Sequence, residues 1–386
     1  MLAERTLLTG AEAVAHAMRQ IDPDVVPVYP ITPQTPIIET FAKLVADGRA
    51  GSQLVNVESE HSALSAAVGS ALAGARTMTA TSSQGLALMA EIVYVAAGMR
   101  APIVMALATR ALSAPINIHG DHSDSMLIRD SGVVQLYAQT AQEAYDLTVM
   151  APRIAEHPDV LLPVVVCQDG FTVTHTAEPA ELLPDEDVRA FVGPYRIPHS
   201  LLDLERPATQ GPFAMPDAYF ELRHDVARAS EAALGVFEEV AAEFELVAGR
   251  RYSALETYEL DGAERVIVLL GSAAGTVAET VDELRTEGER VGLVSVRSFR
   301  PFPRERLREA LASAERVIVL DRALAPGAAG PLFSDVAAAL AGTHAELRGF
   351  VYGLGGRDLL PEHVRAAFEA PGGYLGLQEE EALCLG

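Results

Sequence analysis

Cysteine, lysine and tryptophan are scarce in this sequence. Only Cys167 and Cys384 occur among 386 residues, tryptophan is absent, and Lys43 is the single lysine. Two cysteines are too few for a disulfide scaffold, a cysteine-based zinc site or an iron–sulfur cluster held by this chain alone. Lys43 follows no glycine-rich loop and falls within a helical pattern. The sequence therefore also excludes a P-loop and a pyridoxal-phosphate enzyme.

Positive charge is also in deficit. The chain carries 29 basic against 53 acidic residues, a net charge of −24. Nucleic acid is bound largely through lysine and arginine, so no nucleic-acid partner is expected. Apolar runs such as 161–166 and 266–270 are far too short to span a bilayer. The first residues, including Glu4 and Arg5, show no basic-then-apolar export signal. We therefore expect a cytoplasmic protein without a membrane partner.

Strand-like and helix-like patterns alternate along the first part of the chain. Strands are expected at 25–29, 54–57, 77–81, 103–108 and 163–167, and helices at 11–20, 35–45, 60–75, 83–98 and 141–156. Alternation of this kind predicts a mainly parallel sheet with helices on both faces.

The alternation breaks and then resumes. Prolines punctuate residues 178–216, which have little periodicity and are predicted to be functional or to form an interface, and a long helix is expected over 225–247. A second alternating unit follows, with strands at 265–270, 291–296 and 316–320 and helices at 276–287, 303–312 and 331–341. We expect two α/β domains, residues 1–250 and 251–386.

Three predicted strand ends carry polar side chains. Thr32 precedes Pro33, Glu60 opens a helix, and Arg110 follows a buried strand. Each has an ordinary structural interpretation: Thr32 as a helix N-cap, Glu60 as a charge favourable to a helix N-terminus, and Arg110 as a solvated loop residue. Because parallel strands end at one edge of a sheet, the three could instead form a site for an anionic ligand.

A dense polar loop follows the third strand end. His119, Asp121, His122 and Asp124 lie within six residues. This spacing is compatible with a metal site, but no helix or strand fixes the side chains on one side. The favoured interpretation is a hydrogen-bonded loop placed at an active site, with no metal assigned to it.

The order of these motifs identifies a family. The segments 29–33 (YPITP), 58–60 (ESE), 81–85 (TSSQG), 109–111 (TRA) and 120–124 (GDHSD) occur in that order. Together they resemble the α subunit of 2-oxoacid:ferredoxin oxidoreductases, most closely those acting on pyruvate. The resemblance covers nearly the whole chain. It implies a thiamine-diphosphate pyrimidine-binding domain at 1–250 and a transketolase C-terminal-like domain at 251–386.

The resemblance also implies roles for the three candidate residues. Glu60 would match the glutamate that hydrogen-bonds N1′ of the cofactor's aminopyrimidine and thereby promotes loss of the thiazolium C2 proton. Thr32 and Arg110 would match the residues that hold the 2-oxoacid. His61 departs from the small residue found there in some relatives, which affects the expected surroundings of Glu60.

The family's diphosphate motif is missing. Residues 168–170 (QDG) lack the first glycine of the Gly-Asp-Gly motif, and no asparagine follows them. The resemblance therefore implies that a β subunit carries the Mg²⁺ and diphosphate site. It further implies γ and ferredoxin-like δ subunits, or equivalents, that carry [4Fe-4S] clusters.

The implied reaction converts a 2-oxoacid, coenzyme A and oxidised ferredoxin into acyl-CoA, CO₂ and reduced ferredoxin, with pyruvate the expected substrate. The alternatives left open are a branched-chain 2-oxoacid, 2-oxoglutarate, oxalate or an aryl glyoxylate. A further alternative is a noncatalytic scaffold subunit.

Overall fold

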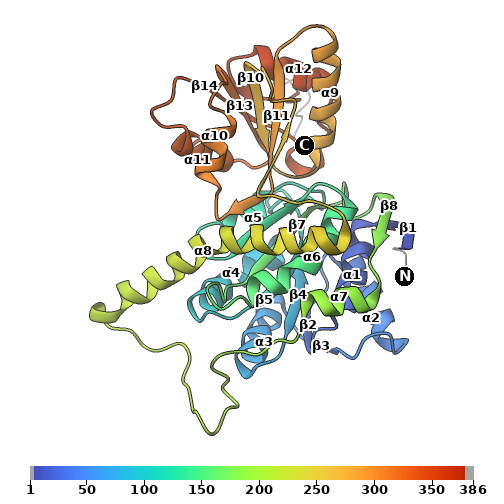
Figure 1. The fold of residues 1–386 in the computed structure, drawn as a ribbon, viewed down its shortest axis with the longest axis vertical. Helices are drawn as coiled ribbons and strands as arrows, with labels where there is room; N and C mark the ends of the chain where they lie inside the picture. Colours follow the sequence, from blue (N-terminus) through green and yellow to red (C-terminus); the bar gives the residue numbers. More distant parts are fainter. Residues whose placement is uncertain (1–3, 379–386) are drawn as a thin grey trace. The chain divides into compact units, whose positions relative to one another are not determined.

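A computed structural model describes residues 4–378, which fall into two compact units (Figure 1). The first unit contains residues 4–254 and 297–303, and the second contains 255–296 and 304–378. The return of residues 297–303 to the first unit was not expected from the sequence. The reason is that this segment adds a strand to the first sheet after the second unit has begun.

A seven-stranded sheet forms the centre of the first unit, in the order β12-β6-β7-β5-β4-β2-β3. All its neighbours pair in parallel except β12, which pairs antiparallel with β6. Its strands are β2 (Val25–Val28), β3 (Gln53–Asn56), β4 (Thr77–Thr81), β5 (Ile103–Thr109), β6 (Val134–Ala138), β7 (Val164–Asp169) and β12 (Ser298–Arg300). Strands β4 to β7 are buried throughout, as the apolar runs of a doubly covered parallel sheet require. A separate antiparallel pair joins β1 (Glu4–Thr9) to β8 (Ala177–Leu182).

Helices cover both faces of this sheet. They are α1 (Gly10–Ile21), α2 (Thr35–Ala46), α3 (Glu60–Ala73), α4 (Ser83–Gly98), α5 (Ser123–Leu127), α6 (Ala141–Ala155), α7 (Asp185–Val192) and α8 (Pro216–Ala248). Helix α1 packs against α2 and α6, whereas α3 packs against α4. Right-handed crossovers along this strand order place α2 and α6 on one face and α3 and α4 on the other. The predicted fold class is confirmed.

Side-chain caps explain where several of these helices begin. The Thr9 hydroxyl accepts from the backbone N–H of Glu12 at 3.2 Å, and the Glu12 carboxylate accepts from the Thr9 N–H at 2.9 Å. This reciprocal capping box satisfies two donors at the start of α1. Ser59 caps α3 in a simpler way, because its hydroxyl accepts from the N–H of Ser62 at 3.2 Å. Glu60 is thereby fixed as the first residue of α3.

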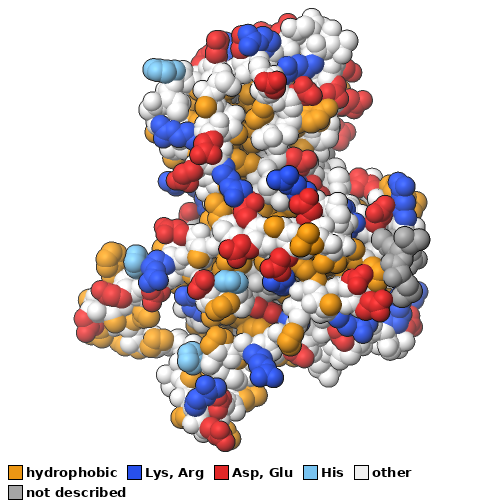
Figure 2. Space-filling model, in the orientation of Figure 1, with side chains coloured by type: hydrophobic (Ala, Val, Ile, Leu, Met, Phe, Trp, Pro, Cys, Tyr) orange, Lys and Arg blue, Asp and Glu red, His pale blue; other side chains and the backbone are white. Residues whose placement is uncertain are grey.

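The proline-rich segment is more ordered than the sequence predicted. Residues 178–216 contain most of β8 and all of α7, and the irregular positions are 183–184 and 193–215. The sequence did not predict β8, whose one pairing within residues 4–378 is with β1. It did not predict α7 either, because that helix has eight residues. Apolar side chains gather on the surface of residues 193–215 and the first turns of α8 (Figure 2). An interface role for this segment stays a prediction.

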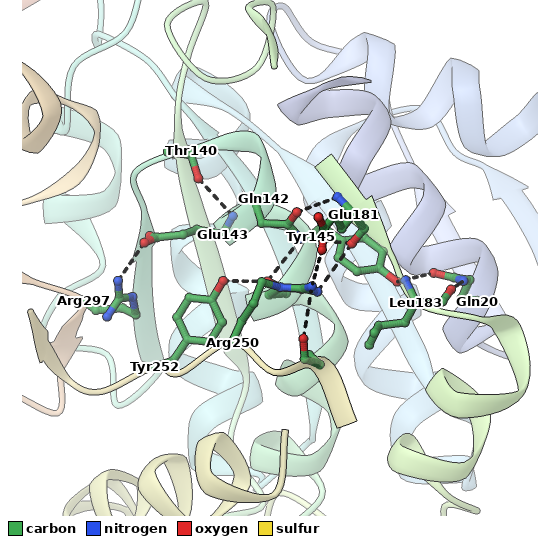
Figure 3. A network of polar contacts seen from close by, with 12 residues as sticks. Gln20, Thr140, Gln142, Glu143, Tyr145, Glu181, Leu183, Arg250, Tyr252 and Arg297 are labelled. Carbon is green, nitrogen blue, oxygen red and sulfur yellow. Dashed lines mark hydrogen bonds and ion pairs between the residues drawn. The ribbon is translucent and has the colours of Figure 1, made fainter. Parts of the chain in front are cut away.

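A buried polar network fixes the end of the first unit (Figure 3). The Arg250 guanidinium donates to both oxygens of Asp146, at 2.6 and 2.7 Å, and the Tyr252 hydroxyl donates to the same carboxylate at 2.6 Å. Asp146 lies on α6 and is fully buried. Burial raises the pKa of Asp146, and the Arg250 hydrogen bonds oppose that rise. The network therefore ties residues 250–252 to the core of the unit.

The second unit is built on a six-stranded sheet in the order β15-β14-β13-β10-β11-β9. Its strands are β9 (Leu255–Tyr258), β10 (Arg265–Leu269), β11 (Val291–Val296), β13 (Arg316–Asp321), β14 (Glu346–Val351) and β15 (Gly373–Tyr374). Its helices are α9 (Ala274–Thr286), α10 (Arg304–Ala310), α11 (Pro331–Ala339) and α12 (Pro361–Glu369), with short 3₁₀ turns at Gly271–Ala273 and Leu354–Gly356. Its core packs α9 and α12 on β10, β11, β13 and β14. The predicted strands and helices of this unit lie within a few residues of those observed.

No helix within residues 4–378 combines the length and the apolar character needed to cross a membrane.

Candidate functional site

Three candidate residues follow strands β2, β3 and β5 at the carboxyl edge of the first sheet. They are Thr32, Glu60 (the first residue of α3) and Arg110 respectively. The three strands run parallel within one sheet, so their carboxyl ends face the same way. This edge is where open α/β sheets bind ligands.

The structure brings Arg110 and Thr32 into contact. Nη1 of Arg110 donates to the backbone carbonyl of Thr32 at 2.9 Å, and Nε donates to the carbonyl of Asn117 at 2.8 Å. Arg110 is 5% exposed, so it is not the solvated loop residue of the alternative interpretation. Burial lowers the pKa of Arg110 from its usual value, and Asp124 opposes that shift. Nη2 has no hydrogen-bond partner in the described part of the chain and is open to an incoming acceptor.

Thr32 is not a helix N-cap. Helix α2 begins three residues later, at Thr35, with Gln34 at the N-cap position. That interpretation of Thr32 is wrong because residues 32–34 form a turn before the helix starts. Thr32 is exposed and offers its hydroxyl at the sheet edge, while its carbonyl holds Arg110.

Glu60 lies buried against the first turn of α4. Its side chain is 7% exposed, and no hydrogen bond or ion pair to its carboxylate occurs within residues 4–378. A Cβ atom placed on Gly85 would stand 2.8 Å from Glu60 Oε1 and 2.6 Å from Thr81 Oγ1. Only glycine at position 85 leaves room for the carboxylate there. The burial of an unpaired carboxylate costs free energy unless a ligand satisfies it.

The two neighbouring candidates differ from Glu60. Glu58 is exposed, and its carboxylate accepts a hydrogen bond from Ser62, which lowers the pKa of Glu58. The His61 side chain is 41% exposed and lies 3.9 Å from the Glu91 carboxylate. Neither residue therefore occupies the buried position that Glu60 holds.

Two further hydroxyl groups were not singled out by the sequence analysis. Thr81 Oγ1 and Ser82 Oγ are buried and have no hydrogen-bond partner in the described structure. Both come from the turn between β4 and α4, the turn against which Glu60 packs. A buried carboxylate and two unpaired hydroxyls form a set of groups that suits a polar heterocycle. Their positions in the 81–85 motif were the available signal.

The loop at 119–124 is a hydrogen-bonded loop beside the site. Nε2 of His122 lies 2.7 Å from the Asp169 carboxylate, and both side chains are buried. Asp124 accepts hydrogen bonds from backbone N–H groups. Within residues 4–378, no three or more histidine, cysteine, aspartate or glutamate side chains are arranged to hold a metal ion. The partnership of Asp169 with His122 was missed, because Asp169 was considered only as part of a diphosphate motif.

Family profiles match both units. The profile described as pyruvate flavodoxin/ferredoxin oxidoreductase, thiamine diP-binding, matches residues 16–242, which include every candidate residue above. A second profile, pyruvate:ferredoxin oxidoreductase core domain II, matches residues 263–364.

Similar proteins extend over nearly the whole chain. The chain is 55% identical to the pyruvate synthase subunit PorA of Thermotoga maritima, over 97% of this chain and 99% of that protein. It is 42% identical to the ketoisovalerate oxidoreductase subunit VorA of Pyrococcus horikoshii, over 95% of this chain and 93% of that protein. Relatives at these identities thus include proteins named for two different 2-oxoacids.

Solved structures share the fold. The chain superposes on a 2-oxoglutarate:ferredoxin oxidoreductase from Magnetococcus marinus with a TM-score of 0.75 and 20% identity. The match covers 95% of this chain and spans 65% of that protein's chain. A split-gene transketolase matches with a TM-score of 0.56 and 16% identity, over 94% of this chain and 98% of that one. These likenesses support the predicted architecture.

Proposed function

Because this chain belongs to the pyruvate flavodoxin/ferredoxin oxidoreductase family, as its ordered motifs predict, we propose that it is the α subunit of a pyruvate:ferredoxin oxidoreductase. The complex would convert pyruvate, coenzyme A and oxidised ferredoxin into acetyl-CoA, CO₂ and reduced ferredoxin. The observation that carries the proposal is the buried, unpaired Glu60 carboxylate at the sheet edge that also holds Arg110. The choice of pyruvate rests on the 55% identity to a pyruvate synthase subunit.

The residues at this edge fit thiamine diphosphate. Glu60, Thr81 and Ser82 supply a carboxylate and two hydroxyls; all three residues are buried, and none of these groups has a hydrogen-bond partner within the described structure. When bound, thiamine diphosphate supplies the nucleophilic carbon and the electron sink for decarboxylation. Glu60 would hold the proton at N1′ of the aminopyrimidine, a role for which a carboxylic acid is suited because it can both donate and accept.

Arg110 would bind the carboxylate of the 2-oxoacid. One N–H of Nη1 and the Nε N–H are engaged by backbone carbonyls, which leaves Nη2 and the second Nη1 N–H at one end of the guanidinium. Those two nitrogens can grip a carboxylate through parallel hydrogen bonds. Thr32 would add its exposed hydroxyl nearby. Decarboxylation would convert that carboxylate into neutral CO₂, and Arg110 would then no longer hold it by charge-assisted hydrogen bonds.

The remaining chemistry would come from partner subunits. A β subunit would carry the Mg²⁺ and diphosphate site, and γ and δ subunits or equivalents would carry [4Fe-4S] clusters that pass electrons to ferredoxin. The support is compositional, since the sequence has two cysteines and residues 168–170 depart from the diphosphate motif. A cytoplasmic location stays a prediction, and cell fractionation with an antibody to this chain tests it.

This division of the site predicts that the isolated chain is inactive. With thiamine diphosphate, Mg²⁺, pyruvate, coenzyme A and an artificial acceptor, the chain alone should give no acetyl-CoA above background. Addition of the partner subunits should restore the activity. Turnover by this chain alone would contradict the proposal, whereas a fully assembled complex that oxidises no 2-oxoacid would favour the scaffold alternative.

A branched-chain 2-oxoacid is the second candidate substrate, because a relative named for ketoisovalerate is 42% identical. The value of kcat/KM for pyruvate, 2-oxoisovalerate, 2-oxoglutarate, oxalate and an aryl glyoxylate on the same complex decides between them. We expect pyruvate to have the highest value.

A further inference from the structure

A single carboxylate, that of Asp124, binds three backbone N–H groups beside the candidate site. Oδ2 accepts from the N–H of Ser83 at 2.7 Å and from that of Arg110 at 3.0 Å, while Oδ1 accepts from Ser125 at 2.7 Å. Asp124 is fully buried. The family assignment and the proposed reaction give this residue no role.

The three donors belong to different elements. Ser83 is the first residue of α4, Arg110 follows β5 directly, and Ser125 lies in α5. Strands β4 and β5 are neighbours in the sheet, so Asp124 joins the loops that follow them. The Ser83 hydroxyl adds a second link, because it donates to the carbonyl of Ala111 at 2.6 Å. Hydrogen bonds therefore join the end of β5 to the start of α4.

These hydrogen bonds hold the backbone at Ser83 in an unusual conformation. Ser83 has a φ of 47°, in the left-handed region that disfavours residues with a side chain. Its N–H is fixed there by Asp124, and Gly85 two residues later packs against Glu60. On the other side, the backbone N–H of Arg110 is fixed by the same oxygen. One carboxylate thus sets the positions of the residues on which Glu60 and the Arg110 side chain rest.

A carboxylate suits this task better than an amide. Its two oxygens both accept, whereas an asparagine would turn an NH₂ group toward one of the three N–H donors. Burial raises the pKa of Asp124, and the three backbone hydrogen bonds oppose that rise because they favour the ionised form. No guanidinium or ammonium donates to this carboxylate within residues 4–378. The backbone N–H groups are its partners.

We propose that Asp124 is a positioning residue for substrate binding: by holding the Arg110 backbone, it aims the guanidinium at the carboxylate of the 2-oxoacid. This inference rests on the proposed function, in which Arg110 binds that carboxylate. Asp124 is fully buried and binds backbone N–H groups. Its effect passes through Arg110.

A double-mutant cycle on the reconstituted complex tests the proposal. Arg110→Ala should raise KM for pyruvate by roughly 30-fold or more, since it removes one partner of a charge-assisted pair. Asp124→Asn should raise KM by about tenfold, with kcat changed less than about threefold, because it leaves a backbone donor unsatisfied. The double variant should match Arg110→Ala alone, since residues that act in series are not additive. Asp121→Asn, a change at a neighbouring buried aspartate, is the matched control and should leave KM unchanged.

A second readout does not depend on activity. Amide hydrogen exchange at Ser83 and Arg110 should become faster in Asp124→Asn and stay as in the wild type in Asp121→Asn. If Asp124→Asn fails to assemble, Asp124→Glu replaces it in the cycle, because the longer side chain keeps the charge but moves the oxygens away from the N–H groups of Ser83 and Arg110. An unchanged KM in that variant would overturn the proposal.

The outcomes separate the inference from the proposed function. If Arg110→Ala leaves KM for every tested 2-oxoacid unchanged, the assignment of Arg110 as the substrate residue fails. If Arg110→Ala raises KM but Asp124→Asn does not, the positioning role alone is overturned. A further rise in KM when Asp124→Asn is added to Arg110→Ala also overturns it, since the effect then bypasses Arg110.

Discussion

Two fully buried aspartates in the first unit have different kinds of hydrogen-bond partner. Asp146 is bound by side chains, namely the Arg250 guanidinium, the Tyr252 hydroxyl and the Gln142 amide (Figure 3). Asp124 is bound by three backbone N–H groups. Burial raises the pKa of both carboxyls, and hydrogen bonds to each carboxylate oppose that rise. Both carboxyl groups are thus removed from water, but one is bound by side chains and the other by the backbone.

The difference separates a structural role from a positioning role. A buried ion pair between side chains can be replaced as a set by apolar side chains, often with little loss of stability. Backbone N–H groups remain whatever the side chain, so the loss of Asp124 leaves its donors without an acceptor. A carboxylate that binds backbone donors therefore fixes the path of the chain. The backbone that Asp124 fixes includes Arg110 of the candidate site. The side chains that Asp146 binds include those of Arg250 and Tyr252, near the end of the first stretch of this unit.

The largest effect on activity is expected from Glu60→Gln, a substitution in the candidate site. The substitution keeps the shape of the side chain and removes its acid–base function. We expect kcat of the reconstituted complex to fall by roughly 10²–10⁴-fold. Exchange of the C2 proton of bound cofactor, followed by NMR, should slow by a similar factor.

Glu58→Gln is the matched control, because Glu58 is exposed two residues away and its carboxylate accepts a hydrogen bond from Ser62. It should leave both rates near those of the wild type. The unfolding midpoint of the first unit should not fall in Glu60→Gln. A normal proton-exchange rate in Glu60→Gln would remove this residue from the proposed mechanism.

Arg250→Ala should have the next largest effect, on stability. It leaves the fully buried Asp146 without its cation, which typically costs about 3–5 kcal/mol. The free energy of unfolding, from urea denaturation followed by circular dichroism, should fall accordingly. KM for pyruvate in the assembled complex should stay unchanged, in contrast to Asp124→Asn.

The same network offers a sharper comparison. A combined Asp146→Leu, Arg250→Met and Tyr252→Phe variant replaces the buried ion pair and its hydroxyl partner by apolar side chains. It should recover most of the stability lost in Arg250→Ala, because no charge is left buried alone. No such rescue is available for Asp124, whose donors belong to the backbone. Equal stability loss in the combined and single variants would contradict the structural role assigned to Asp146.

The sequence was sufficient for the architecture and for part of the site. Alternating patterns predicted the central strands, because buried parallel strands are continuous apolar runs such as Ile103–Thr109. The ordered motifs led to Thr32, Glu60 and Arg110, and the structure brings Thr32 and Arg110 together across 78 positions. The roles assigned to these three residues remain predictions.

Other features depend on contacts that no local pattern encodes. The strand Ser298–Arg300 joins a sheet whose other strands precede it by more than a hundred residues. The partners of Asp124 are backbone groups, and backbone groups are the same for every residue type. The pairing of His122 with Asp169 spans 47 positions. Such contacts become visible only once the strands are placed side by side.

The smallest effect is expected at a third aspartate, Asp185, which is half-exposed and provides an intermediate case. Its carboxylate accepts from both terminal nitrogens of Arg19, at 2.5 and 2.6 Å, and from the Gln20 side chain at 2.8 Å. The Arg19 hydrogen bonds lower the pKa of Asp185 to about 2. The folded chain therefore binds this proton less readily than the unfolded chain does, so the pair stabilises the fold above the unfolded pKa of about 4.

That contribution should disappear as the pH falls from about 4 through about 2, where the carboxyl becomes protonated in the folded chain as well. Solvent screens the pair, since the Asp185 side chain is 39% exposed, and we expect no more than about 1 kcal/mol. The difference in unfolding free energy between the wild type and Asp185→Asn, measured by urea denaturation at several pH values, should shrink over that window. Added salt at pH 6 should reduce the same difference, because the pair is partly exposed, whereas it should leave the Arg250→Ala difference largely intact. A difference for Asp185→Asn that is as large as that of Arg250→Ala and insensitive to salt would contradict the link between burial and the strength of these aspartate contacts.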